Sequence, residues 1–276
     1  VGAGVYQINL VIDTVIASLL ATGSISFLFF ADRVNQLPIG VIGVAVGTAL
    51  LPMLSRQVRS GDIGGALYSQ NRALEFSLLL TIPAAVALMV IADPVIRVLF
   101  ERGAFGVVET KATAAALAMY AAGLPAYVMI KALAPGFFGR EDTSTPVKIS
   151  VMCLVINLIL NLILMDPYKH VGIAAATVIS SWMNAGLLAY VLFRRGHLLV
   201  DSRLSRRIPG IFAASLIMGC ALYVATGLLA EELFGSTVDR VLALLILVVV
   251  GIGLYGILVL ALRIINFEDL RDLYKR

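Results

Sequence analysis

The residues most able to do chemistry are a few polar side chains placed inside long apolar stretches. Asp13 lies between Ile12 and Thr14 in the first such stretch, and Gln7 and Asn9 occupy the turns before it. A carboxylate within the hydrocarbon of a membrane is costly, so it marks a functional site by default. The alternative is a hydrogen bond from Asp13 to a neighbouring helix.

Two asparagines and a threonine could complete a cation site with Asp13. Asn157 and Asn161 are four residues apart, so they share one face of a helix. Thr177 lies in the next apolar stretch, and the backbone carbonyl of Ile173 lies one turn before it. These groups offer only oxygen ligands, one of them anionic, which suits a hard cation such as sodium. The same groups could instead join helices by hydrogen bonds, and the residues alone favour neither interpretation.

Basic residues well inside apolar stretches are further candidates, and two of them are Arg33 and Lys131. Arg33 follows Asp32 and precedes Pro38 by five residues. Its guanidinium could bind a phosphate or pyrophosphate in a water-filled cavity, or it could pair with Asp32 or extend to the membrane interface. Lys131 lies about two turns before Phe138, and we expect its long side chain to reach the cytoplasmic interface.

The sequence shows no pattern typical of an enzyme. It contains no nucleophile–base pattern, no phosphate-binding glycine loop after a strand and no metal-protease motif. Cys153 and Cys220 lie in separate apolar stretches, and His170 and His197 are isolated. We therefore expect a protein that is not an enzyme and requires no cofactor, although its polar residues could bind a sodium ion.

The composition is that of a membrane protein. Hydrophobic residues make up 60% of the 276, charged residues 14%, and the mean hydropathy is +0.98. Soluble domains carry about 25% charged residues. The net charge of +4 needs no nucleic-acid partner, because most basic residues fall in short connections between apolar stretches. The expected fold is an all-α, polytopic bundle of transmembrane helices.

Eight stretches are long enough to cross a membrane, which takes about 20 apolar residues. They cover residues 3–21, 24–54, 68–100, 108–138, 146–165, 171–193, 208–230 and 240–264. The second and fourth exceed the required length, so we expect tilting or kinking there. Fourteen Lys and Arg residues fall on one side of the membrane and five on the other, which predicts a cytoplasmic C-terminus.

Three segments resemble one family of transporters. They are ADRVNQLPIGVIGVAVGTALLPMLSR (31–56), KALAPGFFGREDTSTPVKIS (131–150) and NLILNLILMDPYKHVGIAAATVISSWMNAGLL (157–188). They are similar to the MurJ (MviN) family of the multidrug/oligosaccharidyl-lipid/polysaccharide exporter superfamily. Members have two six-helix lobes and a final helix pair. The resemblance implies that residues 1–200 form the second lobe and 201–276 the final pair with a short cytoplasmic tail, so that an N-terminal lobe is missing.

The resemblance also implies a function, which is the movement of lipid II across the bacterial inner membrane by alternating access. Lipid II is the undecaprenyl-pyrophosphate-linked precursor of peptidoglycan. Arg33 matches a cavity arginine that would contact its pyrophosphate, and the final helix pair would form a groove for the lipid tail. The implied partners are lipid II, membrane lipids and the missing lobe, with no nucleic acid.

A sodium site of the family matches five positions here: Asp13, Asn157, Asn161, Ile173 through its carbonyl, and Thr177. The position of Asn161 can be an aspartate in that site, so this chain has one negative charge fewer. Weaker sodium binding, or transport driven by membrane potential alone, would follow.

Two other functions remain open from the sequence. A related exporter would move other lipid-linked oligosaccharides or drugs. A membrane scaffold of cell-wall synthesis would transport nothing, and it would tolerate removal of the charges of Asp13 and Arg33.

Overall fold

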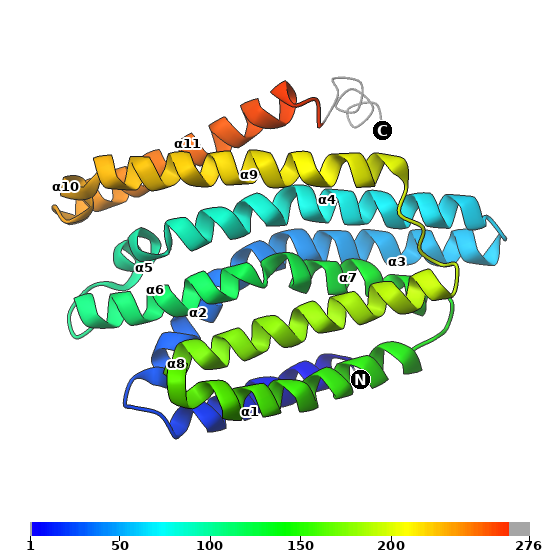
Figure 1. The fold of residues 1–276 in the computed structure, drawn as a ribbon, viewed down its shortest axis with the longest axis horizontal. Coiled ribbons are helices and arrows are strands. Elements are labelled where there is room, and N and C mark those ends of the chain that lie inside the picture. The colour runs from blue at the N-terminus through cyan, green and yellow to red at the C-terminus, as the bar shows by residue number, and fades with distance from the viewer. Residues whose placement is uncertain (1, 265–276) are drawn as a thin grey trace.

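The computed structural model describes residues 2–264, with side chains described from Gln7 onward (Figure 1). The charged segment 268–276 and the predicted cytoplasmic C-terminus lie outside the described residues. The helices are α1 (Gly2–Ser18), α2 (Ser24–Pro38), the π-helix η1 (Ile39–Gly43), α3 (Val44–Arg59), α4 (Ile63–Val90), α5 (Ala92–Phe100), α6 (Val107–Ala122), α7 (Leu124–Phe138), α8 (Ser144–Arg194), α9 (Ser202–Leu228), α10 (Ala230–Leu233) and α11 (Thr237–Ala261).

The predicted all-α membrane bundle is confirmed. Within residues 2–264 every named element is a helix, and the only β-type pairing is an isolated bridge between Arg102 and Phe105. Six helical segments are long and apolar enough to cross a membrane, namely 24–59, 63–90, 107–138, 144–194, 202–228 and 237–261. Counting the shorter apolar helix α1, and counting α8 twice because it folds back on itself, accounts for the eight predicted stretches.

Helix α8 is a hairpin of two antiparallel arms. Its 51 residues run as one helix except at Lys169, whose φ of 53° and ψ of −133° turn the chain back (Figure 1). The arms touch closely beside this turn. A Cβ atom added at Gly172 would lie 2.2 Å from the carbonyl oxygen of Leu164. Only glycine fits at this position, because real Cβ atoms do not approach so closely.

The predicted stretch 68–100 is wrong as a single span. Helix α4 begins earlier, at Ile63, and ends at Val90, and α5 follows as a separate amphipathic helix. Arg97 on α5 is 2% exposed and bonds to Asp93 (2.7 Å) and Glu101 (3.0 Å). These ion pairs allow a buried arginine at the end of the bundle, where an apolar pattern alone suggested a continuous helix.

The second and fourth predicted stretches are interrupted, as their length suggested. In 24–54 the α-helix changes at Pro38 into the π-helix η1, which has one residue more per turn. In 108–138 the helix breaks at Gly123, where an added Cβ would lie 2.7 Å from the ring of Tyr127. Both breaks lie beside residues that line the cavity described below.

The final two long helices lie at one edge of the bundle. Helix α9 packs on α4, and α11 packs on α9 and α5 (Figure 1). Pro83 has no N–H to bond to the carbonyl of Leu79 one turn earlier. The hydroxyl of Tyr255 on α11 donates to that carbonyl instead, at 2.7 Å. Large apolar side chains such as Ile252, which is 71% exposed, cover the outer side of α11, as a lipid-facing helix requires.

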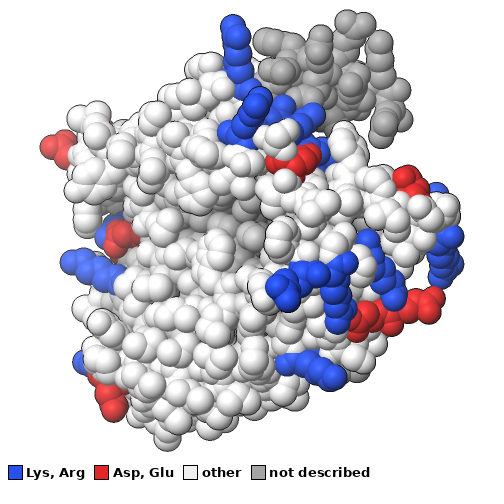
Figure 2. Space-filling model, turned by 45° about the vertical axis from the view of Figure 1, so that its right-hand side comes forward, with Lys and Arg blue, Asp and Glu red and all other residues white. Residues whose placement is uncertain are grey.

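Basic residues gather at one end of the bundle (Figure 2). This end holds the C-termini of α3 and α8 and the start of α9, with Arg56, Arg59, Arg194, Arg195, Arg203, Arg206 and Arg207. The opposite end holds Arg97, Arg102, Lys111, Lys169 and Arg240. The described helices thus place the two groups of basic residues at opposite ends, as the predicted topology requires.

Asp142 ties the two arms of α8 together at the basic end. Its carboxylate accepts hydrogen bonds from the Thr145 amide (3.0 Å) and from Arg195 (2.6 Å). These bonds, with those from the Thr145 side chain and Arg195 largest, lower the pKa of Asp142 to about 2. Because the pKa is lower in the folded state, the ionised carboxylate stabilises the fold at pH values above the pKa of the unfolded chain. This stabilisation is lost as the pH falls toward 2.

Replacing Asp142 with asparagine should therefore cost about 1 kcal/mol of stability near pH 6, a value reduced because the side chain is partly exposed to solvent. Asparagine keeps a capping oxygen for Thr145 but loses the charge. The measurement is thermal unfolding in detergent from pH 6 to pH 2 for both proteins. The difference should shrink toward pH 2, and a difference that stays constant with pH would contradict the role of the charge.

Candidate functional site

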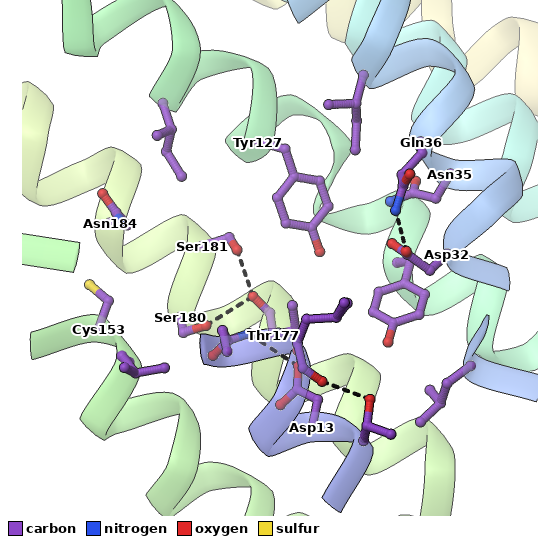
Figure 3. Close-up of a pocket in the computed structure, with 18 of the residues that line it drawn as sticks. Asp13, Asp32, Asn35, Gln36, Tyr127, Cys153, Thr177, Ser180, Ser181 and Asn184 are labelled. Carbon is purple, nitrogen blue, oxygen red and sulfur yellow. Dashed lines mark hydrogen bonds between the residues drawn. The ribbon is translucent and has the colours of Figure 1, made fainter. Parts of the chain in front are cut away.

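A cavity of about 660 Å³ opens between α1, α2, η1, α7 and both arms of α8 (Figure 3). Its wall is apolar for the most part, with polar groups concentrated on α1, α2 and α8. The polar lining residues are Asn9, Asp13, Thr14, Asp32, Asn35, Gln36, Lys131, Ser150, Thr177, Ser180, Ser181 and Asn184. A largely apolar pocket with a few convergent polar groups is typical of a ligand site.

Asp13 joins α1 to both arms of α8 in the wall of this cavity. One carboxylate oxygen accepts a hydrogen bond from Asn161 (2.7 Å), and the other accepts from Thr177 (3.1 Å) and from Asn9 (3.1 Å). In Figure 3 the Asp13 carboxylate points between the helices toward Thr177. The hydrogen bonds predicted as one interpretation of Asp13 are therefore present.

The two asparagines lie on the same face of the first arm, as their spacing predicted. Asn157 is 1% exposed and Asn161 is fully buried, and Asn161 donates to the amide oxygen of Asn157 at 3.0 Å. With its amide turned over, Asn157 would instead donate to Asp13 (3.2 Å) and accept from the Thr177 amide (3.2 Å). Either orientation places its carboxamide between the two arms.

All five predicted sodium ligands meet at this point of the structure. The Thr177 hydroxyl also lies 3.2 Å from the carbonyl oxygen of Ile173, which brings the backbone ligand into the cluster. The amide oxygen of Asn161 is buried and has no hydrogen-bond donor among the described residues. An inward, unsatisfied oxygen beside a carboxylate fits a small hard cation, so the residues present are compatible with sodium.

Arg33 does not line the cavity. It is exposed, and its guanidinium lies 4.8 Å from the centre of the Phe29 ring. No carboxylate lies within ion-pair distance of it in the described part of the chain, so the predicted alternative of a pair with Asp32 is not formed. Its neighbours in sequence, Asp32 and Asn35, face the cavity, which places Arg33 on the adjacent side of α2.

Several polar residues of the cavity were missed or misplaced by sequence reasoning. Asp32 accepts a hydrogen bond from Gln36, one turn later on α2, and Asn35 is 1% exposed beside them. Their spacing of three and four residues was the available signal, because it puts them on one helix face. Lys131 was expected to reach the cytoplasmic interface, but it is half-buried midway along α7 and lines the cavity.

Comparison with protein families assigns the chain. Residues 1–259 match the family described as lipid II flippase MurJ. The chain belongs to the MurJ family. Similarity to individual MurJ proteins agrees with this. A probable lipid II flippase MurJ of Rhizobium meliloti (strain 1021) is 45% identical over 254 residues, covering 91% of this chain and 47% of the relative.

More distant MurJ relatives match nearly the whole chain. A probable lipid II flippase MurJ of Rickettsia prowazekii (strain Madrid E) is 33% identical over 285 residues, covering 98% of this chain and 53% of the relative. The chain thus spans about half the length of the curated relatives it matches.

Solved structures agree with the family. A lipid II flippase MurJ in an inward closed conformation matches with a TM-score of 0.75 and 29% identity, covering 94% of this chain and 52% of that one. An outward-facing multidrug resistance MATE transporter of the MOP superfamily matches with a TM-score of 0.64 and 17% identity, covering 93% and 60%. The latter likeness shows a shared fold. MurJ proteins are transporters, which fits the expectation that this chain is not an enzyme.

Proposed function

We propose that this chain is the C-terminal part of a flippase that moves lipid II across the bacterial inner membrane by alternating access. Membership of the MurJ family carries the proposal. The cavity supports it, because one side of a transport pathway needs a hollow lined with polar groups in an otherwise apolar bundle. The missing N-terminal lobe would close the other side of this cavity.

The domain boundaries follow from the same proposal. Residues 1–200 form the second lobe, and 201–276 form two additional helices and a cytoplasmic tail. Helices α9 and α11, which lie against each other at the edge of the bundle, would form the groove that holds the lipid tail. The gathering of basic residues at the end where α9 begins supports a cytoplasmic position for that end and for the C-terminus.

Arg33 is proposed to contact the pyrophosphate of lipid II from the rim of the cavity. Its guanidinium has no ion pair in the described part of the chain, and it rests on the exposed ring of Phe29. An arginine in this position keeps its donors available to a phosphate that lies between the two lobes.

The test uses the full-length protein in cells depleted of their own lipid II flippase. Wild type, Arg33→Ala and the control Arg59→Ala, at an exposed position in the last turn of α3, are compared at equal membrane levels. We expect wild type and the control to restore lipid II on the outer leaflet, and Arg33→Ala to restore at least tenfold less. Failure of a well-expressed wild type would reject the substrate, and a related exporter of other lipid-linked sugars or a scaffold would take its place.

Sodium binding at the Asp13 cluster is proposed as well. Asp13, Asn157, Asn161, Thr177 and the carbonyl of Ile173 would hold the ion, and bound sodium would join α1 to the two arms of α8. Because Asn161 contributes no charge, Asp13 is the single anionic ligand of this set. The affinity for sodium should accordingly be low.

Replacing Asn161 with aspartate should therefore tighten sodium binding, by about tenfold, because a second carboxylate adds an attraction of about 1.4 kcal/mol. Asp13→Asn should abolish binding. The measurement is the rise in thermal unfolding temperature with added sodium chloride, against choline chloride at the same ionic strength. Equal sodium dependence in wild type, Asp13→Asn and Asn161→Asp would show that the cluster joins helices and binds no sodium.

A further inference from the structure

Lys131 is a charged group in the cavity to which neither the resemblance nor the proposed function gives a role. It lies midway along α7 and lines the cavity, and a charge within a membrane-spanning segment is costly. Because its side chain lines the cavity, Lys131 does not extend to the cytoplasmic interface as expected from the sequence. A charged side chain at this position requires water or a ligand in the cavity beside it.

The neighbouring π-helix is shaped around the lysine side chain. A Cβ atom added at Gly43, the last residue of η1, would lie 2.6 Å from Cδ of Lys131 and 3.6 Å from its Nζ. One turn later, an added Cβ at Gly47 would lie 3.7 Å from the Lys131 carbonyl oxygen. The two glycines therefore leave a slot for the lysine stem between α7 and the η1–α3 segment. A π-helical turn is frequent at functional sites.

The ammonium of Lys131 is not neutralised by the cavity carboxylates. Asp13 is held by Asn9, Asn161 and Thr177, and Asp32 accepts from Gln36. No carboxylate in the described residues lies within ion-pair distance of Lys131, although two line the same cavity. A half-buried ammonium without a counter-ion attracts an anion, so an anionic ligand group in the cavity would stabilise it.

Two side-chain amide oxygens in the cavity wall also lack hydrogen-bond partners. The side-chain oxygens of Asn35, which is 1% exposed, and of Asn184 have no hydrogen-bond donor among the described residues. Both residues line the cavity, on opposite sides of it in Figure 3. Buried carbonyl oxygens of this kind accept from ligand N–H or O–H groups. The cavity wall thus offers one cation for an oxyanion and two acceptors for a sugar or amide.

We propose that Lys131, positioned by Gly43, binds an oxyanion of the transported head group inside the cavity. The inference rests on the proposed function and adds a specificity-determining residue to it. Phosphate oxygens of the pyrophosphate are the expected group, because they carry the highest charge density next to the lipid. A carboxylate of the peptide part is also an oxyanion, and the experiment below distinguishes it from the pyrophosphate.

The experiment measures protein-dependent translocation of lipid II by the full-length protein in liposomes. Initial rates of wild type, Lys131→Ala and the control Lys111→Ala, at an exposed position of α6, are followed against the lipid II content. We expect Lys131→Ala to lower the rate at limiting lipid II by about 10- to 100-fold, as for loss of a charged hydrogen bond, with most of the change in half-saturation. The control should match wild type.

The outcomes separate this inference from the proposed function. If wild type moves no lipid II, the proposed function fails. If wild type moves it and Lys131→Ala has the wild-type rate and half-saturation, the role of Lys131 is wrong. A lipid pyrophosphate that carries the sugars without the peptide distinguishes the two oxyanions. The effect of Lys131→Ala should persist with it, and an effect that disappears assigns Lys131 to the peptide carboxylate instead.

A charge-rescue variant distinguishes loss of the Lys131 charge from a purely structural effect of the substitution. Lys131→Cys is prepared in a protein lacking its other cysteines, including the cavity-lining Cys153. Modification with an aminoethyl thiosulfonate should restore transport at least tenfold, and a neutral reagent of the same length should not. Equal rescue by both reagents would show that the side chain only fills space.

Gly43 provides an independent arm of the test. Gly43→Ala should impair transport in the wild-type background, because the added methyl group occupies the place of the lysine stem. It should add nothing to Lys131→Ala, which has no stem to displace. Gly186→Ala on α8, where an added Cβ meets no atom within 4 Å, is the matched control. Additive effects of Gly43→Ala and Lys131→Ala would mean that Gly43 acts on something other than Lys131.

Discussion

Replacing Gly172 with alanine is expected to destabilise the protein by about 3 kcal/mol or more and to separate the two arms of α8. The added Cβ would lie 2.2 Å from the carbonyl oxygen of Leu164 and 2.7 Å from its carbonyl carbon. Both atoms belong to the backbone of the opposite arm, so no side-chain rotation relieves the contact. Overpacking of this kind forces the backbone to move.

The same variant should disturb the Asp13 cluster at a distance. Asn157 and Asn161 lie on one arm of α8 and Thr177 on the other, so their meeting depends on the close approach at Gly172. The measurement is thermal unfolding of the purified protein with and without sodium chloride. Gly186→Ala on the same helix should be neutral or stabilising, because helical glycine is less favourable than alanine by about 1 kcal/mol. Equal stability of both variants would contradict the close contact.

The second large effect is expected at Glu75, which joins α4 to α9. Its carboxylate is 8% exposed and pairs with Arg72, Arg207 and Arg203. Arg72 also pairs with Asp201, the residue that caps α9 through the Leu204 amide. Removing the central carboxylate would leave partly buried guanidinium groups close together.

Glu75→Ala should therefore lower the free energy of unfolding by about 3–5 kcal/mol, which is the range for removing one partner of a buried ion pair. Glu75→Gln should lower it less, because the amide still accepts a hydrogen bond. Chemical denaturation in detergent measures both, with exposed Glu232→Ala as the control. Wild-type stability of Glu75→Ala would show that the arginines are stabilised by other groups. Increased protease cleavage between α8 and α9 would locate the damage at this interface.

Much of the fold could be predicted because membrane helices are read from length and hydropathy alone. The positions of seven of the eight stretches, and the turn between 165 and 171 that became the α8 hairpin, follow from where apolar sequence stops. The break between α4 and α5 could not be found in this way. Arg97 and its partners Asp93 and Glu101 interrupt an apolar pattern that otherwise continues, and their pairing depends on the folded geometry.

The candidate site was partly visible in the sequence. The i, i+4 spacing of Asn157 and Asn161, together with the membrane cost of Asp13, was enough to predict a cluster that the structure brings together. Lys131 was assigned to the interface because its depth in a long stretch cannot be read without knowing where α6 and α7 divide, at Gly123. The fit between Lys131 and Gly43 joins residues 88 positions apart, so it requires the tertiary structure.

The central claim is that the full-length protein moves lipid II across a bilayer. The most direct measurement reconstitutes it in liposomes that contain fluorescent lipid II in both leaflets and adds an impermeant quencher outside. We predict protein-dependent quenching of the inner pool, with no movement of a fluorescent phosphatidylethanolamine in parallel liposomes. Quenching of lipid II no faster than in protein-free liposomes, by a folded protein in a membrane with an imposed potential and sodium gradient, would contradict the claim.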